Sequence, residues 1–253
     1  MDLGLQGRAA LVCASSKGLG RATALRLAAE QVNIILCSRD KDALAKVVED
    51  IATLGGACLA VAADLNSPAD RERVVKLGVD RFGVIDIAVL NTPGPPPGVF
   101  ADHSLETWRA AYETVLEPVV HLAQLVLPAM EAQGFGRILA NTSFTARAPA
   151  NRMVLSNSLR GAVVGLIKSI ANEYAARGVT ANCILPGYFL TDRMRTVVSA
   201  QSNAEAIVKD IPVGRWGDPD EFGAVSAFLV SQLAGYVTGA AFTLDGGLVR
   251  SVY

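Results

Sequence analysis

A short segment near the start of the chain has the residue types and spacing that hold a phosphate group. An apolar stretch, Ala9–Ala14, precedes glycines at Gly18 and Gly20, and a helical pattern runs over Gly20–Gln31. Where a strand turns into a helix, backbone N–H groups converge and the helix dipole adds positive potential, so anions bind there. The glycines let the backbone approach a pyrophosphate. Because a glycine pair alone fits any tight turn, the prediction depends on the flanking strand and helix.

The end of the next apolar stretch, Asn33–Ser38, indicates which dinucleotide would bind. In such a unit the second strand ends at the adenine ribose, where a carboxylate binds the 2′-hydroxyl and an arginine accommodates a 2′-phosphate. Here Ser38 and Arg39 come first and Asp40 follows. Lys17 in the glycine loop would supply a second positive charge. The two positions agree on NADP(H) over NAD(H), although both charges also fit a solvated surface.

These residues belong to a chain that alternates short apolar runs with longer amphipathic ones. Continuous apolar runs are typical of strands buried on both faces, and the amphipathic runs fit crossover helices. Repeated β-α-β units predict an α/β fold, a doubly wound Rossmann domain with a parallel, seven-stranded sheet. The expected strands are Ala9–Ala14, Asn33–Ser38, Cys58–Ala62, Ile85–Leu90, Gly136–Asn141, Val179–Leu185 and Ala241–Leu244. The expected helices are Gly20–Gln31, Asp40–Leu54, Pro68–Phe82, Ser104–Met130, Arg152–Arg177 and Pro219–Ser231.

The chain is expected to form one domain, residues 1–253, because no linker, repeat or low-complexity stretch divides it. The long Ser104–Met130 helix should be disturbed at Pro118, which cannot donate a backbone N–H. Thr191–Asp210 is polar and has a broken pattern, which indicates a mobile substrate flap.

The composition argues against several other classes of protein. With 23 basic and 24 acidic residues the net charge is −1, which gives no reason to expect nucleic acid or an anionic membrane as a partner. The hydrophobic share of 51% supplies a core, and no apolar run reaches the length of a membrane span. Four scattered cysteines, the lack of a secretory signal and the lack of metal-ligand spacing favour a cytoplasmic protein without a metal site.

Further motifs resemble those of the single-domain short-chain dehydrogenase/reductases, over almost the whole chain. Asp64-Leu65 is similar to the acidic pair at the adenine, Asn91–Gly94 to the Asn-Asn-Ala-Gly motif, and Pro186–Thr191 to the loop over the nicotinamide. Cys13-Ala14 replaces the Thr-Gly that opens the family's glycine loop. The 3-oxoacyl-acyl-carrier-protein reductases are the nearest subgroup by resemblance. The resemblance implies that the cofactor is bound by Ala14, Ser16, Lys17, Gly18, Leu19, Gly20, Ser38, Arg39, Asp64, Leu65, Asn91, Gly94, Arg160, Pro186, Gly187, Phe189 and Thr191.

The catalytic positions depart from the family pattern of Asn, Ser, Tyr and Lys. Counting back from Gly165-Leu166-Ile167-Lys168-Ser169, which resembles a recurrent family stretch, the Tyr position falls on Ser156 and the Lys position on Arg160. The Ser is retained as Ser143, and the Asn position falls on Val115.

These substitutions change the acid–base chemistry that the site can perform. Positions 156 and 160 share one helical face, but Ser156 is a much poorer acid than a phenol, and Arg160 stays protonated. A positioned proton donor contributes about 10²–10⁴-fold in rate. Arg160 and Ser143 would still stabilise an oxyanion, and Arg160 would reach ribose hydroxyls. Tyr188 is the nearest replacement acid by position, although it also fits as a ring packed over the cofactor; a bound water is another donor.

Two functions remain open at this point. The first is an NADPH-dependent oxidoreductase of the carbonyl reductase type, acting on a small carbonyl or alcohol. The second is a cofactor-binding protein without turnover, acting as a regulatory or partner subunit. Five arginines lie on segments that rim the family's substrate cleft. Charges at such loop ends are usually solvated, and that is the default interpretation; if several converge, the ligand would be anionic. The resemblance also implies a homotetramer built on the two long helices. The five arginines are Arg147, Arg152, Arg160, Arg193 and Arg195.

Overall fold

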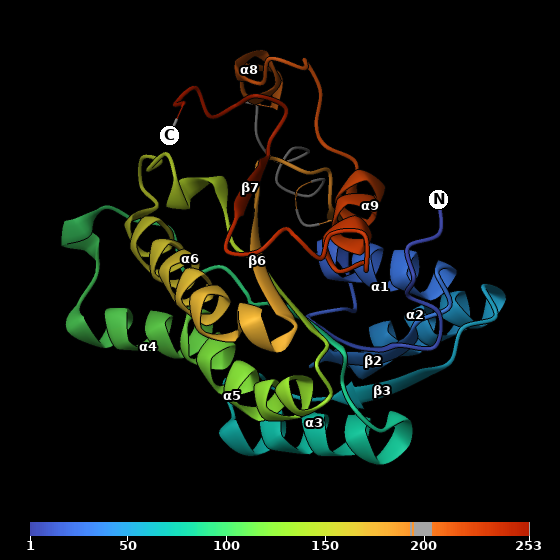
Figure 1. Cartoon of the computed structure of the whole chain (residues 1–253). Coiled ribbons are helices and arrows are strands. Elements are labelled where there is room, and N and C mark those ends of the chain that lie inside the picture. Colours follow the sequence, from blue (N-terminus) through green and yellow to red (C-terminus); the bar gives the residue numbers. More distant parts are fainter. Residues whose placement is uncertain (193, 195–203, 253) are drawn as a thin grey trace.

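Seven parallel strands form the centre of the computed structural model, which describes residues 1–192, 194 and 204–252 (Figure 1). Their order is β3-β2-β1-β4-β5-β6-β7, which confirms the predicted doubly wound sheet. The strands are almost continuous apolar runs, as expected where helices cover both faces. The bounds are β1 Ala9–Cys13, β2 Asn33–Ser38, β3 Cys58–Ala62, β4 Ile87–Asn91, β5 Gly136–Asn141, β6 Val179–Pro186 and β7 Ala241–Leu244.

The register brings the carboxyl ends of the central strands to one edge of the sheet. Cys13 of β1 lies opposite Cys37 of β2, and Asn91 of β4 lies opposite Asn141 of β5. The strand order reverses between β1 and β4, and the crevice at such a switch point is where ligands bind in open α/β sheets. The loops that leave β1, β4 and β5 therefore meet at one place.

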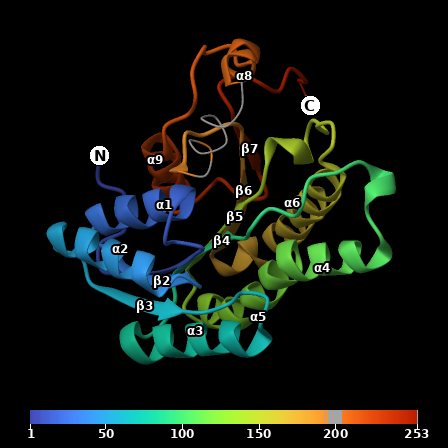
Figure 2. The ribbon, with the colours of Figure 1, turned by 180° about the vertical axis from the view of Figure 1, so that it is seen from behind.

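Helices pack on both faces of the sheet (Figures 1 and 2). The apolar sides of α1, α2 and α9 join one core with the strands, and those of α3, α5 and α6 join the other. Several helices begin at side-chain caps: Ser67 accepts from the Asp70 N–H at the start of α3, and Asp218 accepts from the Asp220 N–H at the start of α9. The bounds are α1 Gly18–Ala29, α2 Lys41–Thr53, α3 Pro68–Phe82, α4 Leu105–Val115, α5 Glu117–Ala132, α6 Val154–Tyr174, α8 Ala204–Asp210 and α9 Pro219–Leu229.

The predicted helix Ser104–Met130 is two helices, α4 and α5, which meet at Leu116. The break falls where Pro118 was expected to disturb the helix, because proline removes a backbone donor in the first turn of α5. The other long helix, α6, starts at Val154, since Arg152 has a left-handed φ of 57°. Of the predicted flap, only residues 191–192, 194 and 204–210 are described, and its remaining residues lie outside the described part of the chain.

The stretch Leu105–Ala132, α4 and α5 together, contains a long apolar window. Its most apolar window has a mean hydropathy of 1.2, enough by length and composition to cross a membrane, and 44% of that window is buried in the protein. The inward side of α5 packs into the same core as α3 and α6. The stretch is therefore apolar because it packs into the core of the protein.

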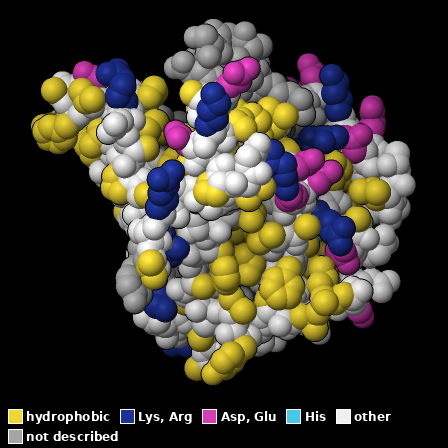
Figure 3. Space-filling model, turned by 90° about the horizontal axis from the view of Figure 1, so that it is seen from above, with side chains coloured by type: hydrophobic (Ala, Val, Ile, Leu, Met, Phe, Trp, Pro, Cys, Tyr) yellow, Lys and Arg dark blue, Asp and Glu magenta, His cyan; other side chains and the backbone are white. Residues whose placement is uncertain are grey.

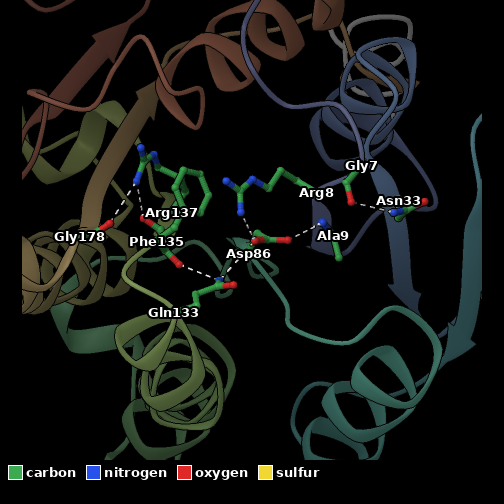
Figure 4. A network of polar contacts seen from close by, with 10 residues as sticks. Gly7, Arg8, Ala9, Asn33, Asp86, Gln133, Phe135, Arg137 and Gly178 are labelled. Atoms are coloured by element: carbon green, nitrogen blue, oxygen red, sulfur yellow. Dashed lines mark hydrogen bonds and ion pairs between the residues drawn. The ribbon is translucent and has the colours of Figure 1, made fainter.

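A polar network closes the amino-terminal edge of the sheet, opposite the switch point (Figure 4). The Asp86 carboxylate accepts from Arg8 Nη1 at 2.9 Å, from the Ala9 N–H at 2.8 Å and from Gln133 Nε2 at 3.2 Å. Both Arg8 and Arg137 place their guanidinium groups over the ring of Phe135, at 3.9 and 4.1 Å from its centroid. These contacts tie the starts of β1 and β5 and the end of α5 together.

Candidate active site at the carboxyl edge of the sheet

The glycine loop after β1 leaves no space for larger residues. A Cβ atom on Gly20 would overlap the carbonyl oxygen of Ala14 and lie 3.1 Å from Nδ2 of Asn91. Gly18 has a φ angle of 57°, a left-handed conformation that glycine adopts at little cost. Ala14, at the start of the loop, has a left-handed φ angle of 50°. A turn from a strand into a helix of this kind brings together the first N–H groups of the helix, which can bind an anion.

The loop is attached to the end of β2 by serine side chains. Ser15 Oγ accepts from the Cys37 N–H at 2.9 Å, and the Ser16 and Ser38 hydroxyls lie 2.7 Å apart. Beside them is a cavity of about 270 Å³ between the ends of β1, β2, β3 and β4, a size that suits part of a nucleotide. Its lining is Ala14, Ser38, Arg39, Ala63, Asp64, Leu65, Asn66, Pro93 and Thr114.

Two basic residues near the end of β2, Arg39 in the cavity lining and Lys17 in the glycine loop, differ in whether their charge is matched. Lys17 Nζ lies 2.9 Å from Oδ2 of Asp40, and both side chains are exposed. Arg39 is exposed and has no ion pair within the described part of the chain. Arg39 is therefore the unmatched positive charge at the end of β2.

The predicted adenine pair is fixed by short backbone contacts. The Asp64 N–H donates to Oδ2 of Asp70 at 2.7 Å, and Oδ1 of Asp64 accepts from the Asn66 N–H at 3.0 Å. The Asp70 contacts also lower the pKa of the Asp70 carboxyl, first through the Asp64 N–H and then through Arg73. Leu65 is buried beside the cavity.

The ends of β4 and β5 are joined by an asparagine pair. Asn141 Nδ2 donates to Oδ1 of Asn91 at 2.9 Å, so the free amide nitrogen of Asn91 lies beside Gly20. Oδ1 of Asn141 is buried and has no hydrogen-bond partner within the described residues. Gly94, further along the loop, has open space around it. The asparagine pair thus links the β4–β5 edge to the glycine loop.

Arg160 of α6 is buried beneath this edge, with 5% of its surface exposed. Its guanidinium donates to the carbonyl oxygens of Thr92, Pro93 and Asn141 at 2.9, 3.0 and 3.3 Å, and to the Thr92 hydroxyl at 2.9 Å. The Thr92 hydroxyl in turn donates to the carbonyl oxygen of Val115 at 3.4 Å. Burial lowers the pKa of Arg160 to about 10. We call these four hydrogen bonds the Arg160 clamp.

The two serines of the predicted catalytic set have different surroundings. Ser156 is buried, and its hydroxyl lies 3.0 Å from the hydroxyl of Thr145. Ser143 is half-buried at the start of the short helix Phe144–Ala146, and its Oγ accepts from the Thr145 N–H at 3.2 Å. Ser143 therefore keeps its own proton to donate, whereas the Ser156 hydroxyl is paired with another buried side chain.

Tyr188 stands in a group of three aromatic rings. Its ring centroid lies 5.4 Å from that of Phe144 and 5.9 Å from that of Trp216. Burial, and then the charge of Asp210, raise the pKa of the Tyr188 hydroxyl. A raised pKa makes the phenol a weaker acid, so these surroundings favour the interpretation of Tyr188 as a packed ring.

The loop Pro186–Thr191 bends back toward the glycine loop. Gly187 lies against Asp245, where a Cβ atom would come within 2.7 Å of the Asp245 Cβ. Thr191 lies beside Gly18, with 3.3 Å between its Cγ2 and a Cβ built on that glycine. Phe189 is buried against the ring of Phe222, so its side chain anchors the loop.

Comparison with known proteins agrees with this arrangement. Residues 13–249 match the family model described as enoyl-(acyl carrier protein) reductase. The chain is 32% identical over 247 residues to 3-oxoacyl-[acyl-carrier-protein] reductase of Synechocystis sp., covering 97% of this chain and 98% of that protein. L-sorbose reductase of Gluconobacter frateurii, solved with NADPH and L-sorbose, superposes with a TM-score of 0.94 at 28% identity over the full length of both chains. YwfH, an NADPH-dependent reductase of bacilysin biosynthesis, gives 0.93 at 28% identity, covering 97% and 99%.

The chain belongs to the short-chain dehydrogenase/reductase family. The retained motifs of this oxidoreductase family lie at the carboxyl edge of the sheet, where Gly20 is beside Asn91 and Gly18 is beside Thr191. The predicted catalytic positions also lie close to that edge. Ser143 and Ser156 both contact Thr145, and Arg160 contacts Thr92 and Asn141. Which of them act on a substrate stays a prediction.

The rim arginines of this short-chain dehydrogenase/reductase do not converge where the structure describes them. Arg147 donates to the Thr243 hydroxyl at 2.8 Å and to the Ala241 carbonyl oxygen at 3.2 Å, which turns it toward β7. Arg152 lies 3.8 Å from Asp102, and Arg160 is engaged in its clamp. Arg193 and Arg195 lie outside the described residues.

Sequence reasoning did not identify Thr92 and Asn141, which join Arg160 to the strand ends. Thr92 follows the motif residue Asn91, and Asn141 ends β5. A polar residue at the carboxyl end of a central strand is the signal that would have indicated both. Asn66 and Thr114 also line the cavity; Asn66 follows the predicted adenine pair Asp64-Leu65, whereas Thr114 lies within α4, where no motif marks it.

Proposed function

We propose that this protein is an NADPH-dependent reductase of small carbonyl compounds. The observation that carries the cofactor assignment is Arg39, an exposed arginine at the end of β2 that has no ion pair among the described residues and lines a cavity that suits part of a nucleotide. An arginine at this place accommodates a 2′-phosphate, and a carboxylate would bind the 2′-hydroxyl of NAD(H). Relatives of similar fold are NADPH-dependent or were solved with NADPH.

The residues at the carboxyl edge fit that cofactor. The glycine loop and the first turn of α1 would hold the pyrophosphate, and the loops Asn91–Gly94 and Pro186–Thr191 would lie on either side of the nicotinamide. When bound, NADPH supplies the hydride. The Arg160 clamp holds the Thr92 and Pro93 carbonyl groups, so it fixes the loop against which the nicotinamide would rest.

Ser143 is the side chain that we assign to the reacting oxygen of the substrate. Ser143 is half-buried, and among the described residues its hydroxyl accepts from the Thr145 N–H alone, which leaves the hydroxyl proton for an oxyanion. The proton that completes the reduction comes from water in this scheme. Ser156 is paired with Thr145, and Arg160 is committed to four oxygen acceptors.

A substrate screen tests this proposal. Wild-type protein with NADPH should reduce a subset of small aldehydes and ketones, measured by loss of NADPH absorbance and by mass spectrometry of the alcohol formed. Removing one oxyanion donor costs about 10²–10³-fold, so Ser143→Ala should lower kcat to that extent. Turnover that Ser143→Ala leaves unchanged would contradict the assignment.

The second candidate is a cofactor-binding partner protein without turnover. The pairing of Ser156 with Thr145 and of Arg160 with backbone carbonyl groups favours it, because both side chains of the family's acid–base pair then serve the fold. Tight binding of NADPH, together with the absence of turnover across the whole substrate panel, would select this candidate over the first.

We also propose a homotetramer. Leu105 and Tyr112 lie on one face of α4 and are 70% and 44% exposed. β7 is the last strand of the sheet, so its outer edge offers unpaired backbone groups to a second copy. On the face shown in Figure 3, basic and acidic side chains are interspersed, without a large area of one sign. Sedimentation at micromolar concentration should give a tetramer, and a monomer would contradict it.

A further inference from the structure

The Lys17–Asp40 ion pair lies where the 2′-phosphate of the proposed cofactor would have to be recognised. The two oxygens of the Asp40 carboxylate serve different partners. Oδ1 accepts from the Ala43 N–H at 3.0 Å and so caps α2, and Oδ2 lies 2.9 Å from Lys17 Nζ. Each partner favours the charged form of the other: Asp40 raises the pKa of Lys17, and Lys17 lowers the pKa of Asp40.

Arg39, between Ser38 at the end of β2 and Asp40 at the start of α2, has no such partner in the described part of the chain. A phosphate at the end of β2 would meet Arg39 directly, but it would meet Lys17 only by taking Lys17 from Asp40. An exposed pair of this kind is weak, so a phosphate group with two negative charges can displace it. That exchange is required for NADP(H) alone, because NAD(H) presents a hydroxyl at the same position.

We propose that Asp40 is a specificity residue that limits the preference for NADP(H) over NAD(H), by competing with the 2′-phosphate for Lys17. The proposal rests on the proposed NADPH-binding function. Asp192 also contributes negative potential at Lys17, and it lines the same surface hollow of about 660 Å³ as Asp40 and Asp42. Asp40 differs from both in combining a direct contact with Lys17 and a helix cap.

Asp40→Asn separates these two roles of the residue. Asparagine is as good a helix cap as aspartate, so α2 keeps its cap while the charge that holds Lys17 is removed. Asp42→Asn is the matched control, because it removes the same charge from the first turn of α2 and from the same hollow without a contact to Lys17. Thermal unfolding of both variants should match that of the wild type.

Titration with NADPH and NADH at low salt tests the proposal. Asp40→Asn should bind NADPH about 3- to 10-fold more tightly and NADH with unchanged affinity, whereas Asp42→Asn should change neither by more than about twofold. In a Lys17→Met background the gain from Asp40→Asn should disappear.

Three results would overturn it. The first is an unchanged NADPH affinity in Asp40→Asn, and the second is an equal gain of NADPH affinity in Asp42→Asn. The third is a gain of NADPH affinity from Asp40→Asn that persists in the Lys17→Met background, which would mean a direct effect of the Asp40 charge on the phosphate. A failure of the proposed function gives a different pattern, since the wild type would then bind neither nucleotide, or bind both equally with no effect of Arg39→Ala.

Discussion

The two ends of the sheet each contain a buried arginine whose partners are backbone carbonyl groups, yet the two ends differ in what surrounds them. Arg137, at the amino edge, donates to the carbonyl oxygens of Gly136, Gly178 and Ser231 and stacks on Phe135. Arg160, at the carboxyl edge, holds the carbonyl oxygens of Thr92, Pro93 and Asn141. Burial lowers the pKa of both, in Arg137 with a further contribution from Arg8.

The neighbours of the two arginines indicate why one edge is structural and the other functional. At the amino edge, the Asp86 carboxylate accepts from Arg8, Ala9 and Gln133, so its charge is matched within the fold (Figure 4), and among the described residues there only the buried Thr180 hydroxyl has no hydrogen-bond partner. At the carboxyl edge, the chain leaves the strands into loops, and polar groups remain unmatched. Oδ1 of Asn141 has no described partner, and Arg39 has no described ion pair. A ligand can satisfy groups of this kind.

The largest expected effect comes from replacing the two arginines. Arg160→Met leaves four oxygen acceptors without their donor, and a buried unsatisfied group costs about 1–3 kcal/mol. We expect a loss of roughly 3 kcal/mol or more in the free energy of unfolding, and an NADPH Kd raised at least about tenfold. Arg137→Met should lose similar stability while its NADPH Kd stays within about twofold. Denaturant unfolding and calorimetry measure both quantities, and equal losses of affinity would break the comparison.

A glycine substitution should affect binding more than stability. The Cβ of Gly20→Ala would overlap the Ala14 carbonyl oxygen and push the loop away from the pyrophosphate. Overpacking costs about 1–3 kcal/mol. Because the shifted loop no longer fits the pyrophosphate, we expect this cost to appear as a loss of binding free energy, which lowers NADPH affinity roughly 10- to 100-fold. Gly161→Ala on α6 is the control, because its Cβ would meet no atom within 4 Å. Unchanged NADPH affinity in Gly20→Ala would remove the glycine loop from the site.

Asp86→Asn should weaken the amino edge alone. It replaces a charged acceptor of three donors by an amide, and hydrogen bonds to charged groups are worth about 1.5–3 kcal/mol. We expect a loss of about 1–2 kcal/mol in the free energy of unfolding, with NADPH affinity and turnover unchanged. A fall in kcat at constant stability would mean that the amino edge takes part in function.

The smallest effect is expected from Tyr188→Phe. Because burial raises the pKa of this phenol, Tyr188 stays protonated to higher pH than an ordinary tyrosine, whose pKa is about 10. Because water is the proposed proton donor, kcat should change by no more than about twofold in Tyr188→Phe. The loss of a general acid would lower kcat by about 10²–10⁴-fold. The pH–rate profile of the wild type should show no step that Tyr188→Phe removes.

The fold could be predicted from the sequence because its strands are buried on both faces. Runs such as Asn33–Ser38 and Gly136–Asn141 have apolar centres, residues 34–37 and 138–140, and their predicted bounds agree with those of β2 and β5. The break at Leu116 was expected near Pro118, since proline acts on the backbone locally. The start of α6 at Val154 was not predicted, because it depends on the left-handed conformation of Arg152.

The sequence indicates candidate site residues, but it does not indicate the contacts that they make in the structure. The glycine loop and Ser143 follow from motif and spacing, whereas the partners of Arg160 are backbone carbonyl groups, which any residue carries and no sequence pattern marks. Likewise, Lys17 was interpreted as a second cation for the phosphate, and its pairing with Asp40 depends on the approach of two loops that are 23 positions apart. Such contacts are a property of the tertiary structure.

Amide hydrogen exchange of the wild type with and without NADPH tests the central claim most directly, because it reports both edges of the sheet in one measurement. The account predicts that NADPH slows exchange in residues 14–20, 38–40, 91–94 and 186–191, at the carboxyl edge. Residues 7–9, 84–86 and 133–137, at the amino edge, should exchange at the same rate in both samples. Protection at the amino edge, or the same exchange everywhere at saturating NADPH, would contradict it.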